Sequence, residues 1–354
     1  MIAMPRRSTC RMVVLSLLVA LAAARGAAAG KALLKASGVT GGLVVHVGCG
    51  DGTLTASLHG SPAHLVKGLS TDPARVAEAR EHLAAAGLIG SVAVAQYDGK
   101  ALPLVDDLVN LLVISDPDYA VAAAETVRAL APRGVVLVPA KTGAIRGLRE
   151  TECPDLPGWR RFVKPVPGEI DDWTHFLHGP DGHAMSNDRV VGPPSHIQWI
   201  GAPQHSRSHI HLTSVSVMVS SGGRLFYIAD EGLTALPSDL PSRWALFARD
   251  AFNGVPLWKR PLASWQPYHV KDRNSFPADL HRRLVASDGM VFATLGIHGP
   301  VSAMDAATGK TLRTYAGTEK TEDIVYEGGL LHLSVNTGDK KDINRLSMAY
   351  RHTE

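Results

Sequence analysis

The chain has 354 residues, of which 45% are hydrophobic and 19% charged, and its formal net charge is +3 at pH 7. These values are typical of a globular protein with material for about two domains, and they exclude a disordered chain or a multi-span membrane protein. Lysine and arginine form no block anywhere along the chain. The sequence therefore argues against nucleic acid as a partner.

The first residues have the pattern of a secretion signal. Basic residues precede an apolar run from Met12 to Ala24, and a small-residue cleavage pattern ends at Ala29. The run is shorter than the roughly 20 apolar residues that a membrane-spanning helix needs. We therefore expect a signal peptide over 1–30 and an exported protein, periplasmic or in the cell envelope, with no membrane contact beyond this leader. An uncleaved anchor is the alternative.

Residues 31–150 alternate apolar strands with alanine-rich helices. The expected strands are 43–48, 91–98, 107–115 and 134–140, and the expected helices are 73–87 and 119–132. The strands are apolar on both faces, as in a sheet that is covered on both sides. This alternation predicts an α/β domain with a Rossmann-like, doubly wound parallel sheet.

The turn after the first strand is rich in glycine. It consists of Gly48, Cys49, Gly50, Asp51 and Gly52 and precedes an expected helix. Glycines at such a turn let backbone N–H groups approach a ligand at the start of the helix. The turn is therefore a candidate site for a nucleotide-like cofactor.

Together with the blocks that follow it, this turn resembles the class I S-adenosylmethionine-dependent methyltransferases. The blocks are GLSTDP, QYDGKALPLVDDLVNLLVI and LAPRGVVLV, and the resemblance covers residues 38–140. It implies that S-adenosylmethionine is the cofactor. It also places Ser70 where the family has the acid that holds the ribose, with Asp72 as a substitute if the strand continues that far, and Asp98 near the adenine amino group.

The sequence departs from the family pattern at several positions. His46 and Ser70 stand where carboxylates are usual, Asn110 replaces an aspartate, and Arg133 replaces the first glycine of a turn. Each lost charged contact costs about 1–3 kcal/mol, a tenfold to hundredfold loss of affinity. No acceptor-site motif is present, and we assign no catalytic residue.

Composition changes after residue 150. A proline-rich connector is expected over 151–171, followed by an all-β region over 172–354. This region repeats one pattern, and the two copies are residues 245–261 and 300–316. In each copy an aspartate is followed four residues later by a glycine: Asp250 and Gly254, Asp305 and Gly309. This spacing is typical of a tight turn, and repeated four-stranded units predict an incomplete β-propeller.

The repeat resembles the blades of pyrroloquinoline-quinone-type propellers over about residues 170–338. AMDAATGKTL closely matches the family turn, and ARDAFNGVPLW keeps Trp258, which we interpret as a blade-packing residue. The chain lacks the adjacent cysteines that often accompany the quinone, so the sequence argues against that cofactor. A ring needs about four to eight blades. We therefore expect a fragment of a longer protein, or a ring completed by blades from elsewhere.

Several histidines lie between residues 171 and 211: His175, His178, His183, His196, His205, His209 and His211. A pair two residues apart shares one face of a strand. A metal site needs three or four converging ligands, and no such motif is present. The sequence therefore predicts no metal, and we interpret these histidines as rim and turn residues.

The leading hypothesis from the sequence is an exported binding or scaffold protein. Its methyltransferase-like domain would have weak or no activity, and its propeller would be a platform for an unidentified protein or small molecule. The first alternative is an active S-adenosylmethionine-dependent methyltransferase. The second is a quinoprotein dehydrogenase completed by missing blades.

Overall fold

The computed structural model describes residues 28–116, 121–193, 197–201, 215–232, 242–263, 265 and 280–337. The chain forms two compact units, Met1–Pro165 and Val166–Glu354. Residues 1–27 of the predicted leader lie outside the described residues, as do His196, His205, His209 and His211. Within the described part, no helix is long and apolar enough to cross a membrane.

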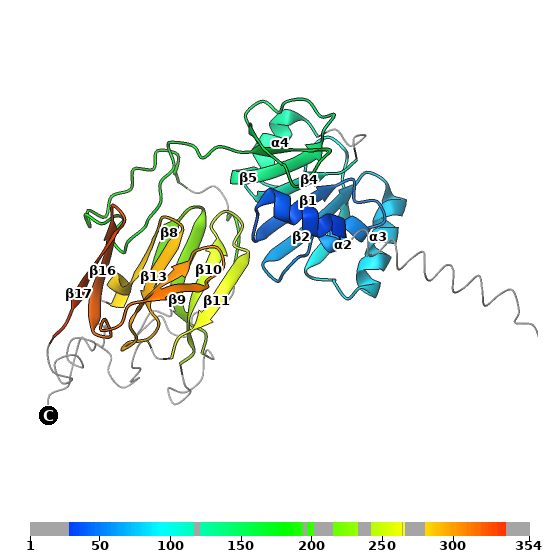
Figure 1. The fold of residues 1–354 in the computed structure, drawn as a ribbon. Helices are drawn as coiled ribbons and strands as arrows, with labels where there is room; N and C mark the ends of the chain where they lie inside the picture. The colour runs from blue at the N-terminus through cyan, green and yellow to red at the C-terminus, as the bar shows by residue number, and fades with distance from the viewer. Residues whose placement is uncertain are drawn as a thin grey trace, which may run out of the picture. The chain divides into compact units, whose positions relative to one another are not determined.

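The first unit is built on a seven-stranded sheet with the order β3-β2-β1-β4-β5-β7-β6 (Figure 1). Its parallel strands are β1 (Gly42–Val47), β2 (His64–Ser70), β3 (Val92–Gln96), β4 (Val109–Ile114) and β5 (Leu130–Pro139). Two antiparallel strands, β6 (Arg149–Thr151) and β7 (Trp159–Val163), extend the sheet beyond β5. The predicted Rossmann-like parallel sheet is confirmed, and its strand order reverses between β1 and β4.

Alternation along the strands divides the core of the first unit between the two faces of the sheet. Val44 of β1 belongs to one buried cluster, and Val45 and Val47 belong to the other. The helices are α2 (Thr53–Ser57), α3 (Pro73–Ala85) and α4 (Ala123–Ala129), and residues 28–37 are also helical. The expected helix over 119–132 is shorter than predicted, because its last residues already belong to β5.

The first unit ends later than composition indicated. Strand β7 lies within the expected connector 151–171, and its Phe162 is buried against Val136 of β5. Strand β7 is paired on both sides, with β5 and with β6, and its backbone hydrogen bonds and buried side chain hold it in the sheet. The proline-rich stretch is therefore partly sheet, and the compact unit runs to Pro165.

Within its described residues, the second unit contains two four-stranded antiparallel sheets and a two-stranded one, together with a short 3-10 helix, η1 (Leu280–Arg283). The first sheet comprises β8 (Val215–Ser221), β9 (Arg224–Asp230), β10 (Trp244–Asp250) and β11 (Pro256–Pro261). The second comprises β12 (Leu284–Ser287), β13 (Met290–Thr294), β14 (Val301–Asp305) and β15 (Thr311–Thr314). Strands β16 (Thr321–Glu327) and β17 (Leu330–Val335) form the third. These meanders are compatible with the predicted blades.

A tryptophan packs on each glycine of the repeated turn. A Cβ atom at Gly254 would lie 2.3 Å from the Trp199 ring, and one at Gly309 would lie 2.6 Å from the Trp258 ring. Each indole N–H also donates to a turn carbonyl 3.0 Å away. Trp258 belongs to β11, so it joins the first four-stranded sheet to the turn of the second. Its expected packing role is therefore present in the structure.

The segment 171–178, which we call the hub segment, contacts all three sheets of the second unit. Three consecutive residues accept one backbone N–H each: Trp173 O from Ser220, Thr174 O from Ala286, and His175 Nε2 from Tyr326. Since Nε2 of His175 accepts, its Nδ1 carries the proton and donates to Thr174 Oγ1, 2.8 Å away. His178 pairs with Asp171 at 2.7 Å. Among the described residues, no cluster could hold a metal ion.

Candidate functional site

The glycine-rich turn joins β1 to α2 beside the point where the strand order reverses. Gly48, Gly50 and Gly52 adopt φ values of 82°, 52° and 84°, in the left-handed region that glycine enters freely. A Cβ at Gly52 would lie 2.9 Å from Ala79 Cβ, so this glycine lets α2 approach α3. A Cβ at Gly50 would meet nothing within 4 Å. The backbone at Gly50 is therefore exposed at the edge where α/β sheets bind ligands.

The rest of the turn is anchored to its neighbours. The N–H groups of Gly48 and Cys49 donate to Leu69 O at 2.9 and 3.2 Å, which ties the turn to the end of β2. The Cys49 side chain is buried in the core, and burial raises the pKa of its thiol to about 11. Asp51 is exposed and its carboxylate accepts the N–H of Thr53 at 2.9 Å. Cys49 is thus a packing residue, whereas Asp51 stays at the open edge.

His46 lies beneath the turn and is completely buried. Its Nδ1 is 2.8 Å from Thr55 Oγ1 on α2, and its Nε2 is 2.7 Å from Ser115 Oγ just after β4. Burial lowers the pKa of His46 to about 4, so the ring is neutral at pH 7. One ring nitrogen donates and the other accepts. His46 therefore links β1, α2 and β4 instead of offering a charge to a ligand.

The two predicted ribose-binding positions differ in what they offer. Ser70 is the last residue of β2, is fully buried, and its Oγ accepts the N–H of Asp72 at 3.2 Å. Asp72 lies beyond the strand, so the alternation that would align it with Ser70 does not extend that far. It is the N-cap of α3 and accepts the N–H of Ala74 at 2.8 Å. Asp72 is exposed and is the carboxylate nearest the end of β2 in the chain.

Asp98 follows β3 at the same edge of the sheet. It is exposed, and its Oδ1 accepts the N–H groups of Lys100 and Ala101 at 2.8 and 3.1 Å. These two hydrogen bonds lower the pKa of Asp98 below its ordinary value, so the group is ionised at pH 7. The adjacent Gly99 lies against Thr71, where a Cβ would come within 3.0 Å. The loop after β3 is therefore in contact with the loop after β2.

Two departures from the family pattern lie away from this edge. Asn110 is near the amino end of β4, where its Oδ1 accepts the N–H of Leu43 at 2.7 Å and lies against Gly42. Asn110 therefore lies away from the cofactor edge, because the amino and carboxyl ends of a parallel sheet are opposite edges. Arg133 adopts φ 68°, in the left-handed region that glycine enters freely.

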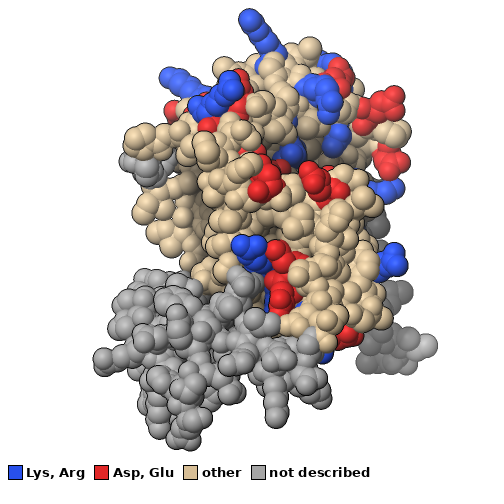
Figure 2. Space-filling view, turned by 90° about the vertical axis from the view of Figure 1, so that its left-hand side faces the viewer, with Lys and Arg blue, Asp and Glu red and all other residues tan. Residues whose placement is uncertain are grey.

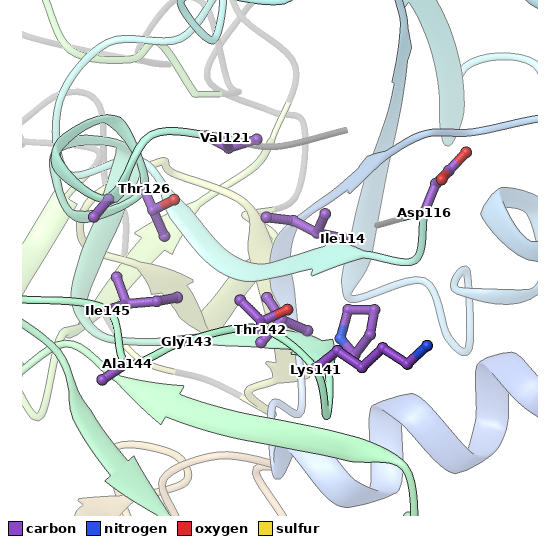
Figure 3. Close-up of a pocket in the computed structure, with 12 residues that line it drawn as sticks. Ile114, Asp116, Val121, Thr126, Lys141, Thr142, Gly143, Ala144 and Ile145 are labelled. Atoms are coloured by element: carbon purple, nitrogen blue, oxygen red, sulfur yellow. The ribbon is translucent and has the colours of Figure 1, made fainter. Parts of the chain in front are cut away.

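A pocket of about 350 Å³ opens at the carboxyl ends of β4 and β5 (Figure 3). Its apolar wall includes Ile114 of β4 and Ile145, both buried. Asp116 and Lys141 lie on one side, and Thr126 and Ile145 lie on the other (Figure 3). Ser115, which bonds His46, immediately precedes Asp116 in the chain. The His46–Ser115 hydrogen bond therefore joins β1, which leads into the glycine-rich turn, to the segment that leads into the pocket. Sequence reasoning missed this pocket, because its residues come from separate loops.

The comparisons with known proteins bear on the first unit. Residues 44–134 match the model of a family described as a methyltransferase domain. The match supports a class I methyltransferase domain in the first unit. It contains every predicted cofactor residue from Gly48 to Asp98. No curated protein matches the chain.

Several solved structures are similar to parts of the chain. A putative S-adenosyl-L-methionine-dependent methyltransferase from Methanococcus maripaludis is 14% identical, with a TM-score of 0.36; the match covers 48% of this chain and 100% of that one. A putative sarcosine dimethylglycine methyltransferase from Galdieria sulphuraria is 20% identical, with a TM-score of 0.29, over 32% of this chain and 45% of that one. The geranyl diphosphate C-methyltransferase of Streptomyces coelicolor, solved with Mg²⁺, geranyl diphosphate and S-adenosyl-L-homocysteine, is 18% identical, with a TM-score of 0.29, over 31% and 43%. This chain spans less than half the length of the last two.

Proposed function

We propose that the first unit binds S-adenosylmethionine at the carboxyl ends of β1 and β2 and methylates a small molecule held in the pocket at β4 and β5. The observation that carries this proposal is the position of the turn and the pocket at one edge of the sheet. His46 and Ser115 connect them through a contact of 2.7 Å. A cofactor and an acceptor at these two places would be neighbours, as direct transfer between them requires.

The residues present fit the nucleoside half of this cofactor. Gly50 leaves an exposed backbone at the turn, and Asp72 and Asp98 are exposed carboxylates after β2 and β3. Carboxylates at such positions accept hydrogen bonds from ribose hydroxyls and an adenine amino group. His46 and Ser70 are buried and hydrogen-bonded within the protein, so neither supplies a charge to the methionine half. We therefore expect binding that is weaker than in a site with carboxylates at both positions.

When bound, S-adenosylmethionine supplies an electrophilic methyl group on a sulfonium. The chain itself would contribute orientation and exclusion of water. The apolar wall around Ile114 and Ile145 would hold the acceptor. The buried His46 would fix the position of α2 relative to the loop after β4 through its two hydrogen bonds. Asp116 and Lys141 are the charged residues among the described lining of the pocket and would orient the polar end of the acceptor.

Calorimetric titration of the full chain with S-adenosylmethionine tests this proposal. The Gly50→Val variant places a side chain on the exposed turn and should abolish binding. Gly87→Val is the matched control, because Gly87 also has a positive φ, 67°, and an unobstructed Cβ position, and it lies after α3. Binding at micromolar to submillimolar concentration that only Gly50→Val removes is the expected result. No binding at millimolar cofactor would refute the proposal.

A second candidate is an exported binding protein without methyltransferase activity. It is favoured by the burial of His46 and Ser70 within the protein's own hydrogen bonds and by the regular tryptophan docking of the second unit. In this case the second unit would be a propeller-type platform for a protein or small molecule. Two experiments test it: cell fractionation of the chain with and without residues 1–30, and the calorimetric titration, in which this candidate predicts no binding of S-adenosylmethionine. Retention of the intact leader-bearing chain in the cytoplasm would contradict export.

A further inference from the structure

The pocket at β4 and β5 separates apolar from charged surface. Most of its described wall is aliphatic, and the two charged residues among the described lining, Asp116 and Lys141, lie on one side (Figure 3). Its volume of about 350 Å³ is at the lower end of the range for small-molecule sites. A pocket of this size and polarity selects a small ligand with an apolar body and one polar end.

Lys141 determines which charge the polar end of the ligand should carry. Within the part of the chain that the structure describes, the Lys141 ammonium makes neither a hydrogen bond nor an ion pair. An ammonium at the rim of an apolar wall attracts an anion more strongly than in open water, because the wall excludes part of the solvent. The Asp116 carboxylate on the same side opposes a second negative charge. A monoanion is thus favoured over a dianion such as phosphate.

We propose that this pocket binds a small monocarboxylate with an apolar body, whose carboxylate pairs with Lys141 while its body packs against Ile114 and Ile145. The proposal rests on the proposed function insofar as this anion would be the methyl acceptor. In that reaction a carboxylate oxygen joins the methyl carbon, and the carbon–sulfur bond breaks with its electron pair retained by sulfur. The products are a neutral methyl ester and a neutral thioether, and no proton is released.

Three isosteric probes test the assignment on the full chain without cofactor: 3-phenylpropanoate, 3-phenylpropanol and 3-phenylpropylammonium. Amide chemical shifts of the pocket residues Gly143 and Ile145 report binding at this site. The carboxylate should bind about tenfold more tightly than the alcohol, and the ammonium most weakly. Lys141→Met should reduce carboxylate affinity to that of the alcohol, while Asp116→Asn should increase it several-fold. Lys310→Met, an exposed lysine of the second unit, is the control and should change nothing.

Equal affinity for the carboxylate and the alcohol would overturn the proposal. So would carboxylate binding that Lys141→Met leaves unchanged, or shifts confined to residues outside the pocket. Because these titrations contain no S-adenosylmethionine, they report on the pocket alone. If the carboxylate is selected but S-adenosylmethionine does not bind, the proposed function is refuted and the ligand class stands. If S-adenosylmethionine binds but the carboxylate is not selected, the ligand class is refuted and the proposed function stands.

Discussion

Acidification should lower the stability of the first unit, because it favours protonation of His46 in the unfolded state. The imidazole is fully buried, and burial lowers its pKa from 6.5 to about 4. In the unfolded chain the ring takes up a proton near pH 6.5, whereas in the folded protein it resists protonation until about pH 4. Stability is therefore fully present above pH 6.5 and is lost as the pH falls toward 4. The loss amounts to about 2 kcal/mol at pH 5, roughly a thirtyfold increase in opening, and about 3 kcal/mol over the whole interval.

Hydrogen exchange of the β1 amides, measured by mass spectrometry and corrected for the intrinsic rate at each pH, follows this opening. The His46→Gln variant keeps a hydrogen-bonding side chain that does not titrate, so its protection should not fall between pH 7 and pH 5. His82→Gln, in the last turn of α3, should behave as the unmodified chain does. Equal protection of β1 at pH 7 and pH 5 would refute the reasoning. An equal loss in His46→Gln would also refute it.

Three further substitutions follow from particular contacts. Gly309→Ala should destabilise the second unit by about 1–3 kcal/mol more than Gly289→Ala in urea unfolding, since both glycines have positive φ but only Gly309 lies against the Trp258 ring. Asn110→Ala should cost about 1–3 kcal/mol, because a backbone N–H loses its acceptor, and should leave cofactor affinity unchanged in calorimetry; a parallel loss of affinity would contradict the placement of Asn110. Arg133→Gly should raise the free energy of unfolding by up to about 1 kcal/mol in urea unfolding, because it removes the strain of a left-handed arginine. A lower free energy of unfolding would show that contacts of the arginine side chain outweigh this strain.

Local patterns in the sequence were sufficient for the parallel sheet, the glycine-rich turn and the repeated aspartate–glycine turns. Strands buried on both faces must be apolar throughout, and left-handed backbone positions favour glycine, so both features can be recognised in the amino-acid sequence. Asp250 and Asp305 accept turn N–H groups, as their spacing indicated. Strand β3 ends at Gln96, so Asp98 lies beyond it and not inside the strand expected over 91–98.

Tertiary structure alone decided what the departures from the family pattern mean. His46 acquires its role from Thr55 and Ser115, and the second partner is 69 residues away in the chain. Asn110 carries the same amide in any fold, yet its position at the amino edge of the sheet removes it from the site. Strand β7 pairs with β5, and local propensity does not encode which strand a segment will pair with. The sequence by itself determined which segments form strands and turns, since those choices depend on neighbouring residues. Which side chains converge was decided only by the pairing of distant strands, because that pairing sets the neighbours of each polar group.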